Sequence, residues 1–164
     1  LRVAECTAVG IAAGYAIGRT GCWAVGDDYG RVWNGWLAVS FPEGLPPTTV
    51  QVMNELYHAD LPATLAPSDV VGVYPTQLLE VLLGLAMFGV LWRLRRHAHA
   101  PGWLFGVYCV LAGIERFIVE FFRAKSDMVG PVTSAQVVAL GVAAAGVLLV
   151  TWRRDPVPTP VPAR

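Results

Sequence analysis

The stretch GWLFGVYCVLAGIERFIVEFFR, residues 102–123, decides the fold of this chain, because it is apolar enough for a membrane helix and still carries charged residues. Arg116, Glu120 and Arg123 follow one another at steps of four and three residues, which predicts one shared helical face. Counting back by fours from Arg116 extends that face to Ala112 and Tyr108. Ionisable side chains are rare inside membrane helices, so this face predicts a functional site.

The composition of the chain indicates an integral membrane protein. Of its 164 residues, 55% are hydrophobic and 15% are charged, well below the roughly 25% that is typical of soluble domains. The formal net charge is zero, so no overall basic field favours nucleic acid as a partner. The three cysteines, Cys6, Cys22 and Cys109, are odd in number and lack metal-ligand spacing, which predicts buried thiols and neither a disulfide nor a metal site.

Three further apolar segments accompany the first, at residues 3–25, 78–94 and 134–152. Each is near or above the length that crosses a bilayer, so the expected fold is all-α, a polytopic transmembrane helix bundle of about four spans. We expect a single transmembrane domain over residues 1–155. Residues 156–164, with alternating prolines, are expected to form a disordered cytoplasmic tail.

A long segment, residues 27–74, separates the first two expected helices and is rich in proline, glycine and aromatic residues. It predicts an external loop, partly laid on the bilayer, with a short helix near residues 54–59 and a short strand near 37–41. Its only lysine or arginine is Arg31, against six acidic residues. The basic residues at 93–96 and 153–154 fall on the other side, so the positive-inside rule predicts that both termini are cytoplasmic.

This topology brings the polar ends of three expected helices together near the outer leaflet. One end carries Arg19, which predicts an anion-binding guanidinium, although an arginine that extends to the interface is the alternative. Another carries Tyr74, Gln77 and Glu80 on one face at a helix start, which is equally typical of a polar helix end. The third carries Glu120 with Arg123.

The sequence GDDYGR, residues 26–31, follows the first expected helix. Two glycines around a polar stretch predict a turn with backbone amides available to a ligand, followed by a guanidinium suited to phosphate. An exposed acidic turn without a ligand is the alternative.

Several short motifs in order carry a resemblance to a known family. They are GRTGC at 18–22, GDDYGR at 26–31, FP at 41–42, YPTQLLE at 74–80, GIERFIVEFFR at 113–123 and SAQ at 134–136. In this order, and on the same membrane sides, they resemble the motifs of prolipoprotein diacylglyceryl transferases over about residues 15–150. The family has additional N-terminal spans, so we expect that a further part of the protein precedes Leu1.

The resemblance implies an enzyme of the bacterial cytoplasmic (inner) membrane, multi-pass, with its site facing the outer leaflet and periplasm. It implies transfer of the diacylglyceryl group of phosphatidylglycerol to a thiol. That thiol belongs to the lipobox cysteine of a prolipoprotein signal peptide. The implied partners are therefore phosphatidylglycerol, the prolipoprotein and other membrane lipids. No nucleic acid, cofactor or metal is implied. By position in the motifs, the expected catalytic residues are Arg19, Arg116, Glu120 and Tyr74. The expected substrate-binding residues are Gly26, Asp27, Gly30, Arg31, Gln77, Glu80 and Arg123.

The chain departs from the family pattern at four positions, of which only Tyr74 is an expected site residue. Tyr74 replaces a histidine, Leu79 a tyrosine, Cys22 an asparagine and Ala112 a tyrosine. A neutral tyrosine donates a hydrogen bond but is a poor base at neutral pH. Two alternatives therefore stay open: a catalytically impaired family member that binds phospholipid in the membrane, and an unrelated bundle in which Arg116 and Glu120 merely pair.

Overall fold

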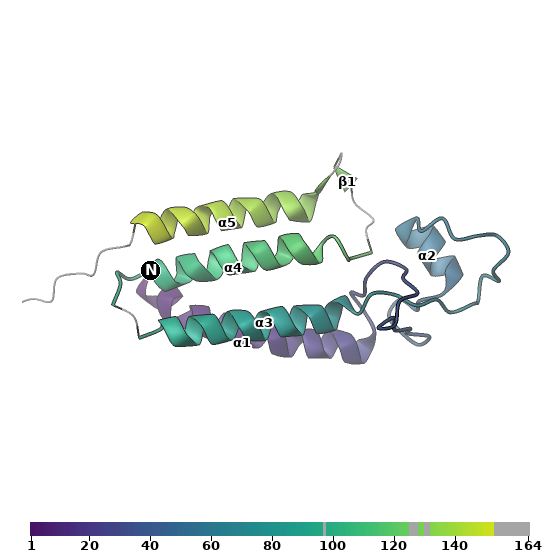
Figure 1. Ribbon diagram of the computed structural model, residues 1–164, viewed down its shortest axis with the longest axis horizontal. Coiled ribbons are helices and arrows are strands. Elements are labelled where there is room, and N and C mark those ends of the chain that lie inside the picture. The colour runs from purple at the N-terminus through teal and green to yellow at the C-terminus, as the bar shows by residue number, and fades with distance from the viewer. Residues whose placement is uncertain (97, 125–127, 130–131, 153–164) are drawn as a thin grey trace, which may run out of the picture.

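Four long helices lie side by side in the computed structural model, which describes residues 1–96, 98–124, 128–129 and 132–152 (Figure 1). They are α1 (Arg2–Val25), α3 (Thr76–Leu94), α4 (Trp103–Val119) and α5 (Ser134–Trp152). A short helix, α2 (Val50–Tyr57), lies with its loops beyond one end of the bundle. Strands β1 (Met128–Val129) and β2 (Val132–Thr133) pair antiparallel just before α5. The expected helical fold is therefore confirmed, with this small hairpin added.

Small residues allow the helices to approach closely. A Cβ atom on Gly113 of α4 would lie 2.5 Å from the Ala139 carbonyl oxygen of α5, and one on Gly146 would lie 2.7 Å from the Gly106 carbonyl oxygen. Between α3 and α1, a Cβ on Gly84 would lie 3.1 Å from the Ala16 Cβ. Membrane helices pack in this way because close backbone contact replaces the hydrophobic driving force that lipid removes.

Two helices in the described part of the chain, α3 and α5, are long and apolar enough to cross a membrane. Their surfaces carry exposed apolar side chains such as Leu82 and Val138, which would face lipid if the helices span. This agrees with a helical membrane protein. The expectation of four spans, with α1 and α4 also crossing, stays a prediction.

The segment between α1 and α3 packs a small core of its own around Tyr29, Met53 and Val73, each at most 2% exposed. The Tyr29 hydroxyl donates to the Pro46 carbonyl oxygen at 2.8 Å. The short helix occupies residues 50–57, starting earlier than the expected 54–59, because the Thr49 side chain caps it. The expected strand at 37–41 is wrong: it is reduced to one antiparallel bridge between Val39 and Val73.

Helix α4 ends before the quoted stretch does. Glu120 is its C-terminal cap, and Arg123 lies beyond it in an antiparallel bridge with Gly30. The prediction that Arg123 shares a helical face with Arg116 is therefore wrong. The chain leaves the helix because the Phe122 carbonyl oxygen accepts the Arg31 amide at 2.9 Å, which joins the end of α4 to the loop after α1. The predicted tail, 156–164, lies outside the described residues.

Candidate active site

The buried carboxylate of Glu80 is the centre of the site. Glu80 lies in the second turn of α3 and is 0% exposed. Its Oε1 atom is 3.1 Å from Arg19 Nη2, 3.5 Å from Arg123 Nη1 and 4.0 Å from Arg116 Nη1. Three guanidinium groups, from α1, from α4 and from the segment after α4, thus surround one carboxylate. We call Glu80 with these three residues the arginine cluster.

Two more acidic side chains pair with the same arginines from outside. Asp28 accepts from Arg19 at 2.7 Å through one carboxylate oxygen and from Arg123 through the other. Glu120 lies 3.2 Å from Arg116 Nη2, one helical turn away. The role of Glu120 in orienting Arg116 stays a prediction. Paired charges of this kind hold guanidinium groups in place inside an apolar bundle.

Tyr15 and Glu115 lie beside the arginine cluster, although the motifs did not predict them as site residues. The Tyr15 hydroxyl lies 2.8 Å from Glu115 Oε1 and 3.3 Å from Glu80 Oε1, and the Arg19 guanidinium lies over the Tyr15 ring. Both residues carried a signal in the sequence. Tyr15 precedes Arg19 by four residues and so shares its helical face, and Glu115 is itself a charge within an apolar helix.

A pocket of about 390 Å³ and another of about 280 Å³ adjoin the cluster, and Arg123 lines both. The smaller one lies within the bundle, where it is lined by Arg19, Arg116, Arg123 and Glu115 together with Tyr108 and Ala112. The predicted alignment of Tyr108, Ala112 and Arg116 is therefore confirmed. Arg116 also borders an apolar groove of about 410 Å³ between α4 and α5, and its side chain is 33% exposed. Arg116 therefore borders both the charged pocket and the apolar groove.

The glycine turn serves the fold more than it offers donors to a ligand. The amides of Gly26 and Asp27 both donate to the Cys22 carbonyl oxygen. The Gly30 amide donates to the Tyr74 carbonyl oxygen, and the Arg31 amide donates to the Phe122 carbonyl oxygen. The expectation of free backbone amides at these four positions is wrong. Gly26 instead ends α1 with a φ of 70°, and a Cβ on Gly30 would lie 2.5 Å from the Phe122 oxygen.

Gln77 and Thr76 hold this turn against the start of α3. Gln77 is 0% exposed, and its Nε2 atom donates to the Asp27 carbonyl oxygen at 2.7 Å. The Thr76 hydroxyl donates to the Asp28 carbonyl oxygen at 2.9 Å. These bonds fix the backbone that presents Asp28 to Arg19 and Arg123. Gln77 therefore lies beside the cluster, where its motif position predicted it.

Tyr74 and Arg31 point elsewhere. Tyr74 precedes α3, and its ring stacks on Trp33 at 4.3 Å between centroids, with Phe122 at its edge. The expectation that it shares a face with Gln77 and Glu80 is wrong, because the helix starts only after Pro75. The exposed Arg31 lies against the Tyr74 ring and lines the outer pocket of about 390 Å³ with Arg123.

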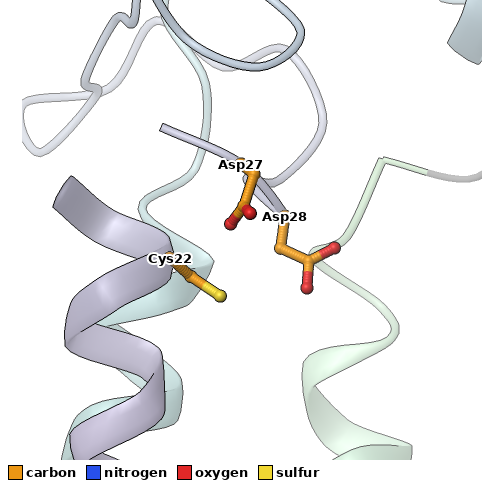
Figure 2. Close-up of side chains that lie close together, drawn as sticks. All are labelled: Cys22, Asp27 and Asp28. Atoms are coloured by element: carbon orange, nitrogen blue, oxygen red, sulfur yellow. The ribbon is translucent and has the colours of Figure 1, made fainter. Parts of the chain in front are cut away.

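Cys22, Asp27 and Asp28 converge at the end of α1, as Figure 2 shows. Their ligand atoms lie within 4.8 Å of one another, a spacing that a metal ion could bridge. Each carboxylate oxygen of Asp28, however, is already paired with an arginine, and the Cys22 sulfur lies 3.7 Å from Arg19 Nη1. Because both oxygens of Asp28 already pair with guanidinium groups, the trio fits an acid–arginine network better than a cation site.

Comparison with known proteins places this geometry in a family. Residues 1–152 match the family model described as prolipoprotein diacylglyceryl transferase. The chain belongs to the prolipoprotein diacylglyceryl transferase family. The match covers every residue of the arginine cluster and of the turn after α1, so the resemblance predicted from the motifs is confirmed.

Individual relatives are bacterial proteins named phosphatidylglycerol–prolipoprotein diacylglyceryl transferase. The chain is 37% identical to that of Stenotrophomonas maltophilia over 158 residues, which cover 90% of this chain and 51% of the relative. It is 30% identical to that of Chlorobaculum tepidum over 147 residues, which cover 87% of this chain and 43% of the relative. It is 33% identical to that of Treponema denticola over 129 residues, which cover 74% of this chain and 38% of the relative. The chain thus spans about half the length, or less, of these relatives.

Proposed function

We propose that this chain carries the phosphatidylglycerol site of a bacterial prolipoprotein diacylglyceryl transferase. The protein would transfer the diacylglyceryl group to the thiol of a lipobox cysteine and so mature lipoproteins in the bacterial cytoplasmic (inner) membrane. Membership of the family and the names of the relatives support the reaction class.

One observation carries the proposal: Arg116 is held between the inner pocket and the groove between α4 and α5. Glu120 fixes one nitrogen of its guanidinium at 3.2 Å, while a third of the side chain stays exposed. A guanidinium has five N–H donors, so an arginine anchored on one side can still bind phosphate on the other. A phospholipid could place its phosphate here and its acyl chains in the apolar groove.

The chemistry requires one bond to form and one to break. The thiol sulfur bonds to a glyceryl carbon, the bond between that carbon and a phosphate oxygen breaks, and glycerol phosphate leaves. Negative charge grows on the leaving phosphate, and Arg116 and Arg19 would stabilise it. Glu80 and Asp28 would hold these guanidinium groups in position beforehand, since each arginine is already paired.

The proton of the thiol needs an acceptor. Tyr74 is a poor choice on two grounds: its ring is packed against Trp33, and a neutral phenol is a weak base. The carboxylates of Glu80, Glu115 and Glu120 are the candidates that we propose among the described residues near Arg116. We assign Tyr74 to packing the loop and not to proton transfer.

We also propose that α1, α3, α4 and α5 all span the membrane. They lie side by side, and the arginine cluster lies at the end that also holds the folded segment 27–74 (Figure 1). With the basic residues after α3 on the cytoplasmic side, the cluster would face the outer leaflet and periplasm. Phosphatidylglycerol and an exported prolipoprotein signal peptide would meet there.

The experiment that tests the function uses the full-length protein in membranes with phosphatidylglycerol and a lipobox peptide. Mass spectrometry follows the diacylglyceryl adduct on the peptide cysteine. We expect an adduct with the parent protein and a loss of at least about 100-fold in its rate with Arg116→Ala, since preorganised charge stabilisation is worth that much. Arg31→Ala, in the outer pocket, is the comparison variant and should lose less.

Two results would contradict the proposal. A folded parent protein that binds phosphatidylglycerol without forming an adduct would favour a lipid-binding family member without catalysis. An adduct that forms equally well with Arg116→Ala would remove Arg116 from the mechanism.

A further inference from the structure

A second pocket lies at the opposite end of the bundle from the arginine cluster. It has a volume of about 640 Å³ and lies between α1 and α3, close to the start of α4. Its floor is apolar, formed by Val9, Phe88 and Leu104 with Gly10, whose α-carbon has open space beside it. Its rim is basic, formed by Arg95 and Arg96 just after α3.

The acidic side chain in the wall of this pocket is already engaged. Glu5 accepts the Gly102 amide at 2.5 Å and the Leu104 amide at 3.1 Å, and it lies 3.1 Å from His99 Nδ1. It therefore caps the start of α4 from the neighbouring helix. The Glu5 carboxylate therefore pairs with that helix end and with His99, not with Arg95 or Arg96. The rim of the pocket keeps its positive charge.

The rim lies where a lipid headgroup would be. Helix α3 is one of the two helices able to cross a membrane, and it ends at Leu94, directly before Arg95. The Arg95 guanidinium folds back over the Trp92 ring, 3.5 Å from its centroid, and Trp92 is half exposed. Tryptophan and arginine at the end of a span are typical of the membrane interface.

We propose that this pocket binds an anionic phospholipid of the cytoplasmic leaflet. Its phosphodiester would lie between Arg95 and Arg96, and one acyl chain would lie along Val9, Gly10 and Phe88. A basic pocket between helices at this membrane side suits a lipid headgroup, and the apolar floor suits a chain that a soluble phosphate lacks. The site is separate from the transfer reaction, and it rests on the proposed topology, in which α1 and α3 span the membrane with the basic end of α3 cytoplasmic.

Trp92 at the rim allows a direct test with the full-length protein in phosphatidylcholine vesicles. The fluorescence of Trp92 is obtained by subtracting the fluorescence of Trp92→Phe from that of the parent. Its quenching is then measured once with acyl-brominated phosphatidylserine and once with acyl-brominated phosphatidylcholine in the vesicles. We expect stronger quenching by the anionic lipid. The double variant Arg95→Gln with Arg96→Gln should weaken binding of the anionic lipid roughly 25-fold, because each arginine near a headgroup contributes a factor of about five.

Arg93→Gln is the matched control, because Arg93 is an exposed arginine of the same helix end that does not line the pocket. It should leave the quenching close to that of the parent. Circular dichroism of each variant checks that the helices are intact.

Three results would overturn the proposal. They are equal quenching by the two brominated lipids, an unchanged preference in the double variant, and loss of the preference when inorganic phosphate is added, which would indicate a small-anion site. Phosphatidylserine is not the proposed donor lipid, and Trp92 reports only this end of the bundle. Failure here is therefore distinguishable from failure to form the lipobox adduct.

Discussion

At the scale of single residues, Glu80 decides how the arginines are held. It is the one carboxylate that lies within 4.0 Å of all three guanidinium groups in the described part of the chain, and it is fully buried. Removing one partner of a buried ion pair leaves charge uncompensated in a region that cannot solvate it. The cluster therefore combines a role in stability with the proposed role in phosphate binding.

Glu80→Gln keeps the size of the side chain and removes its charge. We expect a loss of about 3 kcal/mol in the free energy of unfolding, because three guanidinium groups lose their shared partner. Unfolding of the full-length protein in detergent measures it, with the exposed Glu55→Gln on α2 as control. Equal unfolding midpoints for Glu80→Gln and Glu55→Gln would show that Glu80 is not the centre of the cluster.

Tyr74 offers a sharp distinction between packing and chemistry. Tyr74→Phe keeps the ring that stacks on Trp33, so we expect the adduct rate to stay near that of the parent. Tyr74→Ala should lower the free energy of unfolding by about 1 kcal/mol, the typical contribution of an aromatic pair. A large loss of adduct rate in a stable Tyr74→Phe protein would show that the Tyr74 hydroxyl takes part in the reaction.

At the scale of elements, the contact between α4 and α5 depends on glycine. Gly113→Leu would force a side chain onto the Ala139 carbonyl oxygen and the Ala143 backbone. We expect destabilisation of about 2 kcal/mol or more, as for other overpacked interiors, and a displaced Arg116 with a lower adduct rate. Thermal unfolding and the adduct assay measure the two effects.

Gly141→Leu is the matched control, because a Cβ there meets nothing within 4 Å. It should be neutral or slightly stabilising, since glycine is a poor helix former. If both substitutions destabilise the protein equally, close packing of α4 on α5 is not the cause.

At the scale of the whole molecule, four spans with one orientation predict opposite accessibility of two loops. Ser40 lies in the segment between α1 and α3, and Ala98 follows the basic end of α3; both are exposed. In intact cells, a membrane-impermeant maleimide should label Ser40→Cys and should label Ala98→Cys only after the membrane is opened. Labelling above that of the parent, whose residues 1–164 contain three cysteines, is the measurement. Labelling of both positions from outside would contradict the topology.

The sequence by itself determined the helical fold, the places of the four long helices and the family. These features depend on local patterns: runs of apolar residues define helices, and Pro75 and Gly26 mark where two of them begin and end. It also placed Arg19, Glu80 and Glu120 near one another, with Arg116 one helical turn from Glu120, because the positive-inside rule puts the polar ends of these helices on the same side of the membrane.

Only the tertiary structure decided which groups meet. The bridge between Gly30 and Arg123 ends α4 early and turns Arg123 toward Asp28 and Glu80. Backbone carbonyl oxygens from distant segments take up the amides of the glycine turn, and Trp33 holds the Tyr74 ring away from the cluster. Each of these outcomes depends on contacts between segments far apart in the sequence, and neither helical periodicity nor a local motif encodes such contacts.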